Sequence, residues 1–87
     1  MDNRVAVISI IVEREDAIEE LNNLLHEARQ YIIGRMGIPY RLKGISIISI
    51  AIDAPQDVIS TLSGKIGRLS GISTKTAYSN IITKAGE

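Results

Sequence analysis

Two stretches decide the fold of this chain: RVAVISIIV at residues 4–12 and ISIISIAI at residues 45–52. Successive side chains of a strand point to opposite faces, and a sheet with one covered face alternates apolar with polar residues. Both stretches are instead apolar on both faces. The chain has only two helix candidates, enough for one face, so we expect a second copy or a tightly bound partner on the other. We assign this interface to apolar side chains that share a face: Val5, Val7, Ile11, Ile45 and Ile47.

The segment between these stretches predicts a helix and a weaker strand. Apolar residues at a 3.6-residue spacing predict a helix from about residue 14 to about residue 30. A β-prone segment at 31–38 follows, and we expect Pro39 to end it because proline lacks the N–H that a sheet ladder needs. Residues 39–44 then form a loop that leads into the second decisive stretch.

The segment after these stretches predicts a second helix and a last strand. We expect Asp53 near the helix cap and Pro55 in the first turn, with Gly71 as a left-handed cap at the C-terminal end. Alternation then predicts a strand at 72–79. Residues 81–87 form a short tail or an extension of that strand.

The resulting order of elements is βαββαβ. Right-handed crossovers place the first and third strands at the centre of a four-stranded antiparallel sheet, with both helices on one face. This is an α+β fold of the ferredoxin-like type. The two strands that are apolar on both faces are the two that this topology makes central, so pattern and topology agree. The 87 residues, 1–87, fit a single domain.

Composition excludes several classes of function. Ten basic and ten acidic residues give a formal net charge of zero, which argues against direct binding of nucleic acid. The absence of cysteine rules out disulfides, a thiol nucleophile and thiolate metal ligands. No apolar run is long enough to span a membrane, and the N-terminus does not resemble a signal peptide. We therefore expect a cytoplasmic protein without membrane association.

Two isolated polar residues are candidates for a site. His26 lies on the outward face of the first helix, where it either lines a metal or proton-sensing site completed by another subunit or is simply solvated. One histidine without cysteine is too few ligands for a transition-metal site within one chain, so we expect no metal. Arg35 stands between Gly34 and Gly37 and either binds an anion or occupies an edge strand, which we favour.

The run SGKIGRLSG at residues 63–71 resembles a phosphate-binding loop but has the wrong spacing. A P-loop would need glycine at Ile59 and serine or threonine at Ile66. Two glycines inside a helix either leave a bare surface that a ligand or partner approaches, beside two basic side chains, or mark a final turn that frays. The residues of this candidate ligand or partner site are Ser63, Gly64, Lys65, Gly67 and Arg68, together with Arg35.

The sequence contains no arrangement typical of catalysis. It lacks a Gly-x-Ser-x-Gly turn and a histidine close to a serine in sequence. The acidic residues at 13–20 are typical of the N-terminal end of a helix and of its solvation. We expect no enzyme activity, no catalytic residue and no cofactor. A small enzyme whose site is shared between subunits would require His26 to meet a carboxylate or serine of another chain.

Three segments together resemble a known family: VISIIVE at 7–13 followed by Leu24-Leu25-His26, GRMGIP at 34–39, and LSGKIG at 62–67 through Ser70-Gly71-Ile72. They are similar to the iron-only hydrogenase system regulators, small ACT-like proteins related in fold to the ligand-binding domain of the nickel-responsive repressor. The resemblance covers nearly the whole chain, and the Leu-Ser-Gly-Lys-x-Gly stretch is its most specific part. No catalytic residues come with it.

The resemblance implies an ACT-like fold, association through sheets and helices, and a regulatory role near hydrogenase maturation in anaerobes. Amino-acid-binding ACT domains usually have glycine in the turn after the first strand, where this chain has Glu13-Arg14-Glu15-Asp16, so amino-acid binding is not expected. Nickel-sensing relatives use several histidines and a cysteine, whereas this chain has one histidine and no cysteine, so nickel sensing by that site is not expected. The first hypothesis is a non-catalytic sensory domain, a homo-oligomer (dimer or tetramer) that binds a small ligand or a protein partner of the hydrogenase system. The alternative is a scaffold that binds a hydrogenase-maturation protein and no small molecule.

Overall fold

The computed structural model describes residues 2–84, which form a four-stranded sheet and two helices. The order of elements is β1 (Asp2–Val12), α1 (Ala17–Glu27), the 3-10 turn η1 (Arg29–Tyr31), β2 (Ile32–Tyr40), the 3-10 turn η2 (Arg41–Lys43), β3 (Ile45–Pro55), α2 (Gln56–Gly67) and β4 (Ile72–Lys84). The strands are antiparallel in the order β2-β3-β1-β4, so β1 and β3 are central. The predicted ferredoxin-like βαββαβ fold is confirmed.

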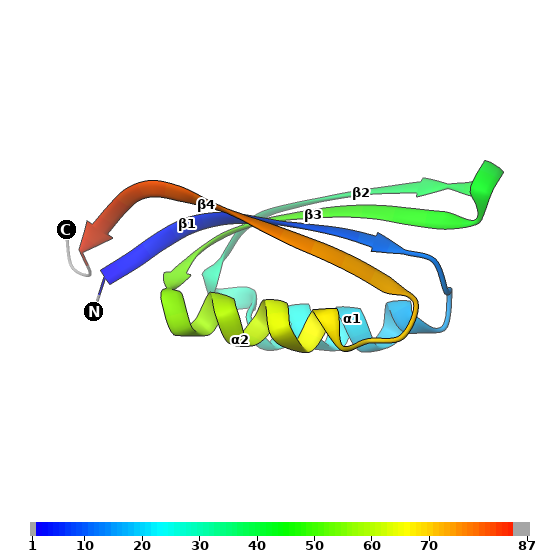
Figure 1. The fold of residues 1–87 in the computed structure, drawn as a ribbon, viewed down its shortest axis with the longest axis horizontal. Helices are drawn as coiled ribbons and strands as arrows, with labels where there is room; N and C mark the ends of the chain where they lie inside the picture. The colour runs from blue at the N-terminus through cyan, green and yellow to red at the C-terminus, as the bar shows by residue number, and fades with distance from the viewer. Residues whose placement is uncertain (1, 85–87) are drawn as a thin grey trace.

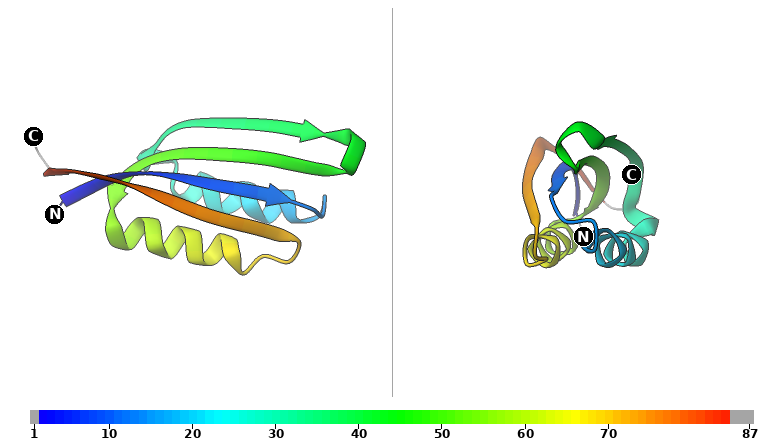
Figure 2. Two further views of the ribbon diagram at one scale, coloured as in Figure 1. Left: turned by 45° about the horizontal axis from the view of Figure 1, so that its top comes forward. Right: turned by 90° about the vertical axis from the view of Figure 1, so that its right-hand side faces the viewer.

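Both helices lie side by side beneath the same face of the sheet (Figures 1 and 2). The register explains this, because β1 and β3 pair with Ile8 opposite Ile50 and Ile10 opposite Ile48. Their side chains therefore project together toward the helices, and every other residue projects away. At one end of the molecule the β2–β3 hairpin extends past the helices, and at the other β1 and β4 extend past them together (Figure 1).

The hydrophobic core fills the space between the sheet and the helices. Helix α1 supplies side chains at the 3.6-residue spacing seen in the sequence, and α2 supplies a narrower stripe. No polar or charged residue is fully buried in the part of the chain that the structure describes. The core residues are Ala6, Ile8, Ile10 and Val12 of β1, Ile48, Ile50, Ile52 and Ala54 of β3, Ala17, Leu21, Leu25 and Ala28 in or just after α1, and Ile59, Leu62 and Ile66 of α2.

The first helix is shorter than predicted at both ends. It begins at Ala17, because the preceding residues are held in a turn that contacts the turn between α2 and β4. The N–H of Glu13 donates to the carbonyl of Gly71 at 2.7 Å, and Arg14 forms an ion pair with Asp16 at 2.7 Å. After Glu27 the chain tightens into η1, where Tyr31 N–H donates to the carbonyl of Ala28.

Both prolines lie in strands, which corrects two predictions. Pro39 does not end β2, which continues to Tyr40, because an edge strand tolerates the missing N–H. Pro55 is the last residue of β3 and precedes α2, with extended backbone angles of φ −57° and ψ 147°. Asp53 pairs with Val5 in the sheet and does not cap the helix. The strand extends this far because β1 begins at Asp2 and offers it a partner.

The segment after α2 also differs from the prediction. The helix ends at Gly67, so Gly71, although left-handed with φ 78°, shapes the turn before β4 and does not cap α2. Strand β4 continues to Lys84, so residues 81–84 extend the last strand, while 85–87 of the expected tail lie outside the described residues. A bulge at 79–81 allows this extension: Ala6 pairs with Tyr78, whereas Arg4 pairs with Ile82.

Candidate functional site

The face of the sheet opposite the helices is uncovered and apolar. Val5, Val7 and Ile47 are each 38% exposed and Ile11 is 43% exposed, whereas the alternate residues of β1 and β3 are buried. Ile45 lies on the same face and is half-buried. The structure thus places all five residues of the predicted interface on one uncovered face. The interface itself stays a prediction.

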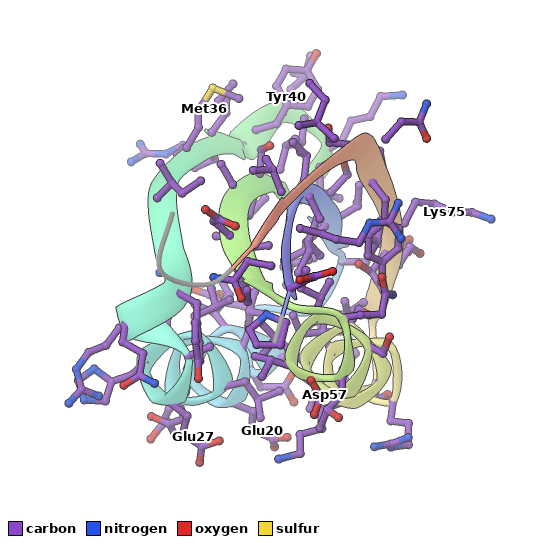
Figure 3. All side chains as sticks on the ribbon, turned by 90° about the vertical axis from the view of Figure 1, so that its left-hand side faces the viewer. Glu20, Glu27, Met36, Tyr40, Asp57 and Lys75 are labelled. Atoms are coloured by element: carbon purple, nitrogen blue, oxygen red, sulfur yellow. The ribbon has the colours of Figure 1, made fainter. Side chains whose placement is uncertain are left out.

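Strand β2 adds three large side chains that the sequence analysis did not include. Met36, Ile38 and Tyr40 are exposed, and their partners in β3 are Ser49, Ile47 and Ile45. Figure 3 shows Met36 and Tyr40 on the side of the sheet away from the helices. Their spacing at every second residue was the available signal, and the glycine and proline between them obscured it. We call the eight residues Val5, Val7, Ile11, Met36, Ile38, Tyr40, Ile45 and Ile47 the open sheet face.

The glycines of α2 lie within regular helix, so the alternative of a frayed turn is wrong for Gly64. A side chain at Gly64 would have ordinary contact with Nη1 of Arg68 at 3.7 Å, and one at Gly67 with Cγ2 of Thr74 at 3.6 Å. Ser63 is already engaged, because its hydroxyl donates to the carbonyl of Ile59 at 2.9 Å. The packing within this chain therefore does not require glycine at either position.

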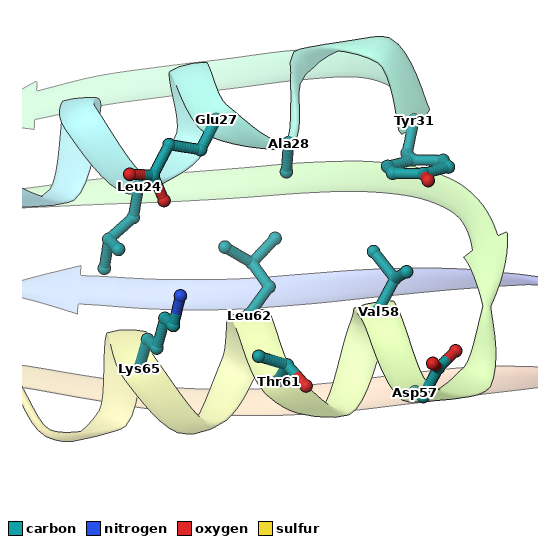
Figure 4. A pocket seen from close by; sticks show the side chains of 9 residues that line it. All are labelled: Leu24, Glu27, Ala28, Tyr31, Asp57, Val58, Thr61, Leu62 and Lys65. Atoms are coloured by element: carbon teal, nitrogen blue, oxygen red, sulfur yellow. The ribbon is translucent and has the colours of Figure 1, made fainter.

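A groove of about 240 Å³ runs between the two helices, and Lys65 is the one residue of the predicted α2 site that lines it. Figure 4 shows Leu62 and Val58 of α2 pointing across the groove toward Ala28, which follows α1, and Tyr31 of η1. The carboxylates of Glu27 and Asp57 flank the groove together with the amino group of Lys65. Its lining residues are Leu24, Glu27, Ala28, Tyr31, Asp57, Val58, Thr61, Leu62 and Lys65.

Arg35 does not join the α2 residues. It lies on the helix side of the edge strand β2, where its Nη2 donates to Oδ1 of Asn22 on α1 at 2.8 Å. The predicted edge-strand position is confirmed. Arg35 lines a hollow with His26, which is exposed as predicted, and this hollow contains no residue of α2. The six residues of the predicted ligand site therefore divide between two places.

No group of three or more histidine, aspartate or glutamate side chains able to hold a metal ion occurs within the described residues. The helices of the same region are all too short to cross a membrane. The turn after β1 is occupied by side-chain contacts: Arg14 donates to Oγ of Ser70 at 3.1 Å and pairs with Asp16.

Comparison with known proteins gives one family and a set of similar folds. Residues 4–76 match the model of the TM1266-like family, which is described as "Iron-only hydrogenase system regulator, putative". Among curated proteins, no relative matches the chain. The solved structure of TM1266 from Thermotoga maritima is 36% identical, with a TM-score of 0.84 over 87% of this chain and 96% of that chain.

Two formyltetrahydrofolate deformylases share the fold. The enzyme from Pseudomonas putida KT2440 is 14% identical, with a TM-score of 0.64 over 88% of this chain and 29% of that chain. The enzyme from Pseudomonas syringae pv. tomato is 11% identical, with a TM-score of 0.56 over 91% of this chain and 28% of that chain. At this identity the likeness shows the fold alone, an ACT-like arrangement that makes up under a third of each enzyme.

Proposed function

The chain belongs to the TM1266-like family of the iron-only hydrogenase system, and we propose that it is a non-catalytic regulatory domain that works as a homo-oligomer. The observation that carries the proposal is the open sheet face. Seven of its eight side chains are at least 38% exposed, although all eight are apolar or aromatic. Large apolar side chains exposed together on one face are typical of an interaction site.

The pattern of large and small side chains favours a second copy as the occupant. In the register, Ile38, Ile47 and Ile11 form one row across three strands, and Val7, Ala51 and Ala77 form another. The row between them consists of Met36, Ser49, Ser9 and Lys75, so the two serines lie at its centre and the two long side chains at its ends. A two-fold axis that runs along this middle row, perpendicular to the strands, would place the isoleucine row of each copy against the row of Val7, Ala51 and Ala77 of the other copy. Such a face is self-complementary, as a symmetric dimer requires.

The charged groups near this face lie at its margins. Lys75 belongs to the outer strand β4 and points away from the molecule in Figure 3, and Asp53 lies near the end of β3. The helix side is more polar, with Glu20, Glu27 and Asp57 on its outer surface (Figure 3). This difference between the two sides supports association through the sheet. A dimer of this kind leaves the helices free to pair further into a tetramer or to bind another protein.

We also propose that regulation passes through a protein partner of the hydrogenase system. Both helices pack their apolar sides against the sheet, and the formal net charge is zero, which offers little to the phosphates of DNA. The groove between the helices, with its apolar floor and charged rims, is the surface that such a partner would meet (Figure 4).

Native mass spectrometry of protein purified under anaerobic conditions tests the assembly. We expect a homo-oligomer for the natural chain and a monomer for Ile47→Asp, because a carboxylate in a buried apolar interface loses its hydration without gaining a partner. Asn23→Asp adds the same charge on the exposed side of α1 and should leave the oligomer unchanged. Far-UV circular dichroism checks that all three fold. A natural chain that is monomeric at micromolar concentration, or an Ile47→Asp variant that still assembles, would contradict the proposal.

A further inference from the structure

A second feature of the surface lies apart from the open sheet face, at the edge of β2. A hollow of about 310 Å³ is formed where the last turns of α1, η1 and β2 meet. Its position on the helix side of the edge strand keeps it clear of the surface proposed for assembly. The lining residues are Asn22, Leu25, His26, Arg29, Ile32 and Arg35.

The polar groups of this hollow are suited to donate hydrogen bonds to an anion, and no carboxylate lines it. Of the carboxylates on α1, Glu19 lies one turn before Asn22 but is not among the lining residues, Glu20 lines the pocket beside Ser70, and Glu27 lines the groove between the helices. Arg14 with Asp16 is the one ion pair found among the side chains that the structure describes. Two arginines, Arg29 and Arg35, therefore line the hollow, and neither forms an ion pair with a side chain that the structure describes.

Neutral oxygens hold both guanidinium groups in place. Nη1 of Arg29 donates to the carbonyl of His26 at 2.9 Å, and Nη2 of Arg35 donates to Oδ1 of Asn22 at 2.8 Å. Each guanidinium has five N–H donors, and these are the only hydrogen bonds it makes to the described residues. Most of the donors on both side chains are thus available to a ligand, and the groups that carry them are already positioned.

We propose that this hollow binds the phosphoryl group of a small molecule. A guanidinium presents two parallel N–H groups that match the oxygens of a phosphate, and two guanidiniums match the charge of a phosphate dianion. The imidazole of His26 and the amide nitrogen of Asn22 are further donors on the rim. The open position and the ordinary strength of such contacts place binding of inorganic phosphate in the roughly millimolar range.

The test is a titration of the uniformly ¹⁵N-labelled full chain with inorganic phosphate, at an ionic strength held constant with potassium chloride. We expect saturable shifts of the amide signals of residues 22–35, with signals of α2 unchanged. Arg35→Gln should weaken binding about tenfold or more, because it removes charge-assisted hydrogen bonds. Arg41→Gln removes the same charge from the exposed hairpin end and should leave the affinity unchanged within about twofold.

Succinate, titrated in the same way, separates a phosphoryl ligand from a dicarboxylate, and we expect it to bind more weakly than phosphate. Tighter binding of succinate would overturn the phosphoryl assignment. Equal binding of phosphate to the natural chain and Arg35→Gln, or shifts that chloride alone reproduces, would overturn the site. Both variants keep the open sheet face, so native mass spectra of the same samples report on assembly independently.

Discussion

At the scale of single residues, Gly71 joins two turns that are far apart in sequence. Its left-handed φ of 78° is a conformation that side chains rarely adopt. Its carbonyl accepts the N–H of Glu13, and a Cβ atom at this position would lie 2.5 Å from Cγ and 2.7 Å from Cβ of Arg14. Both the conformation and the close approach require glycine. Gly71 thereby fixes the turn before α1 against the turn before β4.

We predict that Gly71→Ala destabilises the fold by about 2–3 kcal/mol. The left-handed conformation accounts for about 1–2 kcal/mol, and displacement of Arg14 adds the remainder. Urea unfolding at a fixed protein concentration measures the change. Gly44→Ala is the control, because its φ is 64° but no atom lies within 4 Å of the added Cβ. Its free energy of unfolding should therefore fall only by the cost of the left-handed conformation, about 1–2 kcal/mol. Equal losses in the two variants would show that contact with Arg14 contributes nothing.

At the scale of elements, the central strands could be predicted because the preferences of their own residues determine that these segments form strands. β1 and β3 are rich in β-branched residues, which favour a strand over a helix, and the 3.6-residue period of α1 is equally clear. The ends of the elements depended on partners distant in sequence. Pro55 belongs to a strand only because Asn3 lies opposite, and β4 passes position 80 only because a bulge restores its pairing with β1.

The candidate sites were predictable to a similar extent. The open sheet face followed from alternation in β1 and β3, whereas Met36, Ile38 and Tyr40 were missed because β2 contains two glycines and a proline. Arg35 and His26 were each identified alone, and only the packing of β2 beside α1 brings them to one hollow. Arg29 gave no signal in the sequence, because its role depends on where the chain turns after the helix.

Helix α2 provides a prediction at this scale. Gly64→Ala should raise the free energy of unfolding by about 0.5–1 kcal/mol, because alanine favours helix and the added methyl group has room at 3.7 Å from Arg68. Urea unfolding of both proteins measures the gain. Gly67→Ala, at the last residue of the helix, should gain less. A loss of stability in Gly64→Ala would indicate that the helix needs glycine for its own packing, and Gly64 would then give no support to a contact with another chain.

At the scale of the whole molecule, the strands exceed what two short helices can cover. The Cα atoms extend over 44 × 19 × 18 Å, and β1, β3 and β4, with 11 to 13 residues each, lie over helices of 11 and 12 residues. A strand rises about 3.3 Å per residue and a helix 1.5 Å, so the sheet is about twice as long as its cover. A domain of this size buries only about 60–65% of its unfolded surface, and association through the open sheet face would add to its stability.

Stability should therefore depend on protein concentration. If a dimer unfolds to separate chains, each tenfold dilution lowers the free energy of unfolding of the dimer by about 1.4 kcal/mol, which moves the urea midpoint down by roughly 0.5–1 M. We predict this shift for the natural chain between 100 and 1 µM (about two tenfold steps). The Ile47→Asp monomer should have one midpoint at all concentrations, whereas Asn23→Asp should behave as the natural chain. A concentration-independent midpoint in the natural chain, with an oligomer present throughout that range, would mean that the protomers are stable alone and that the open sheet face contributes little to folding.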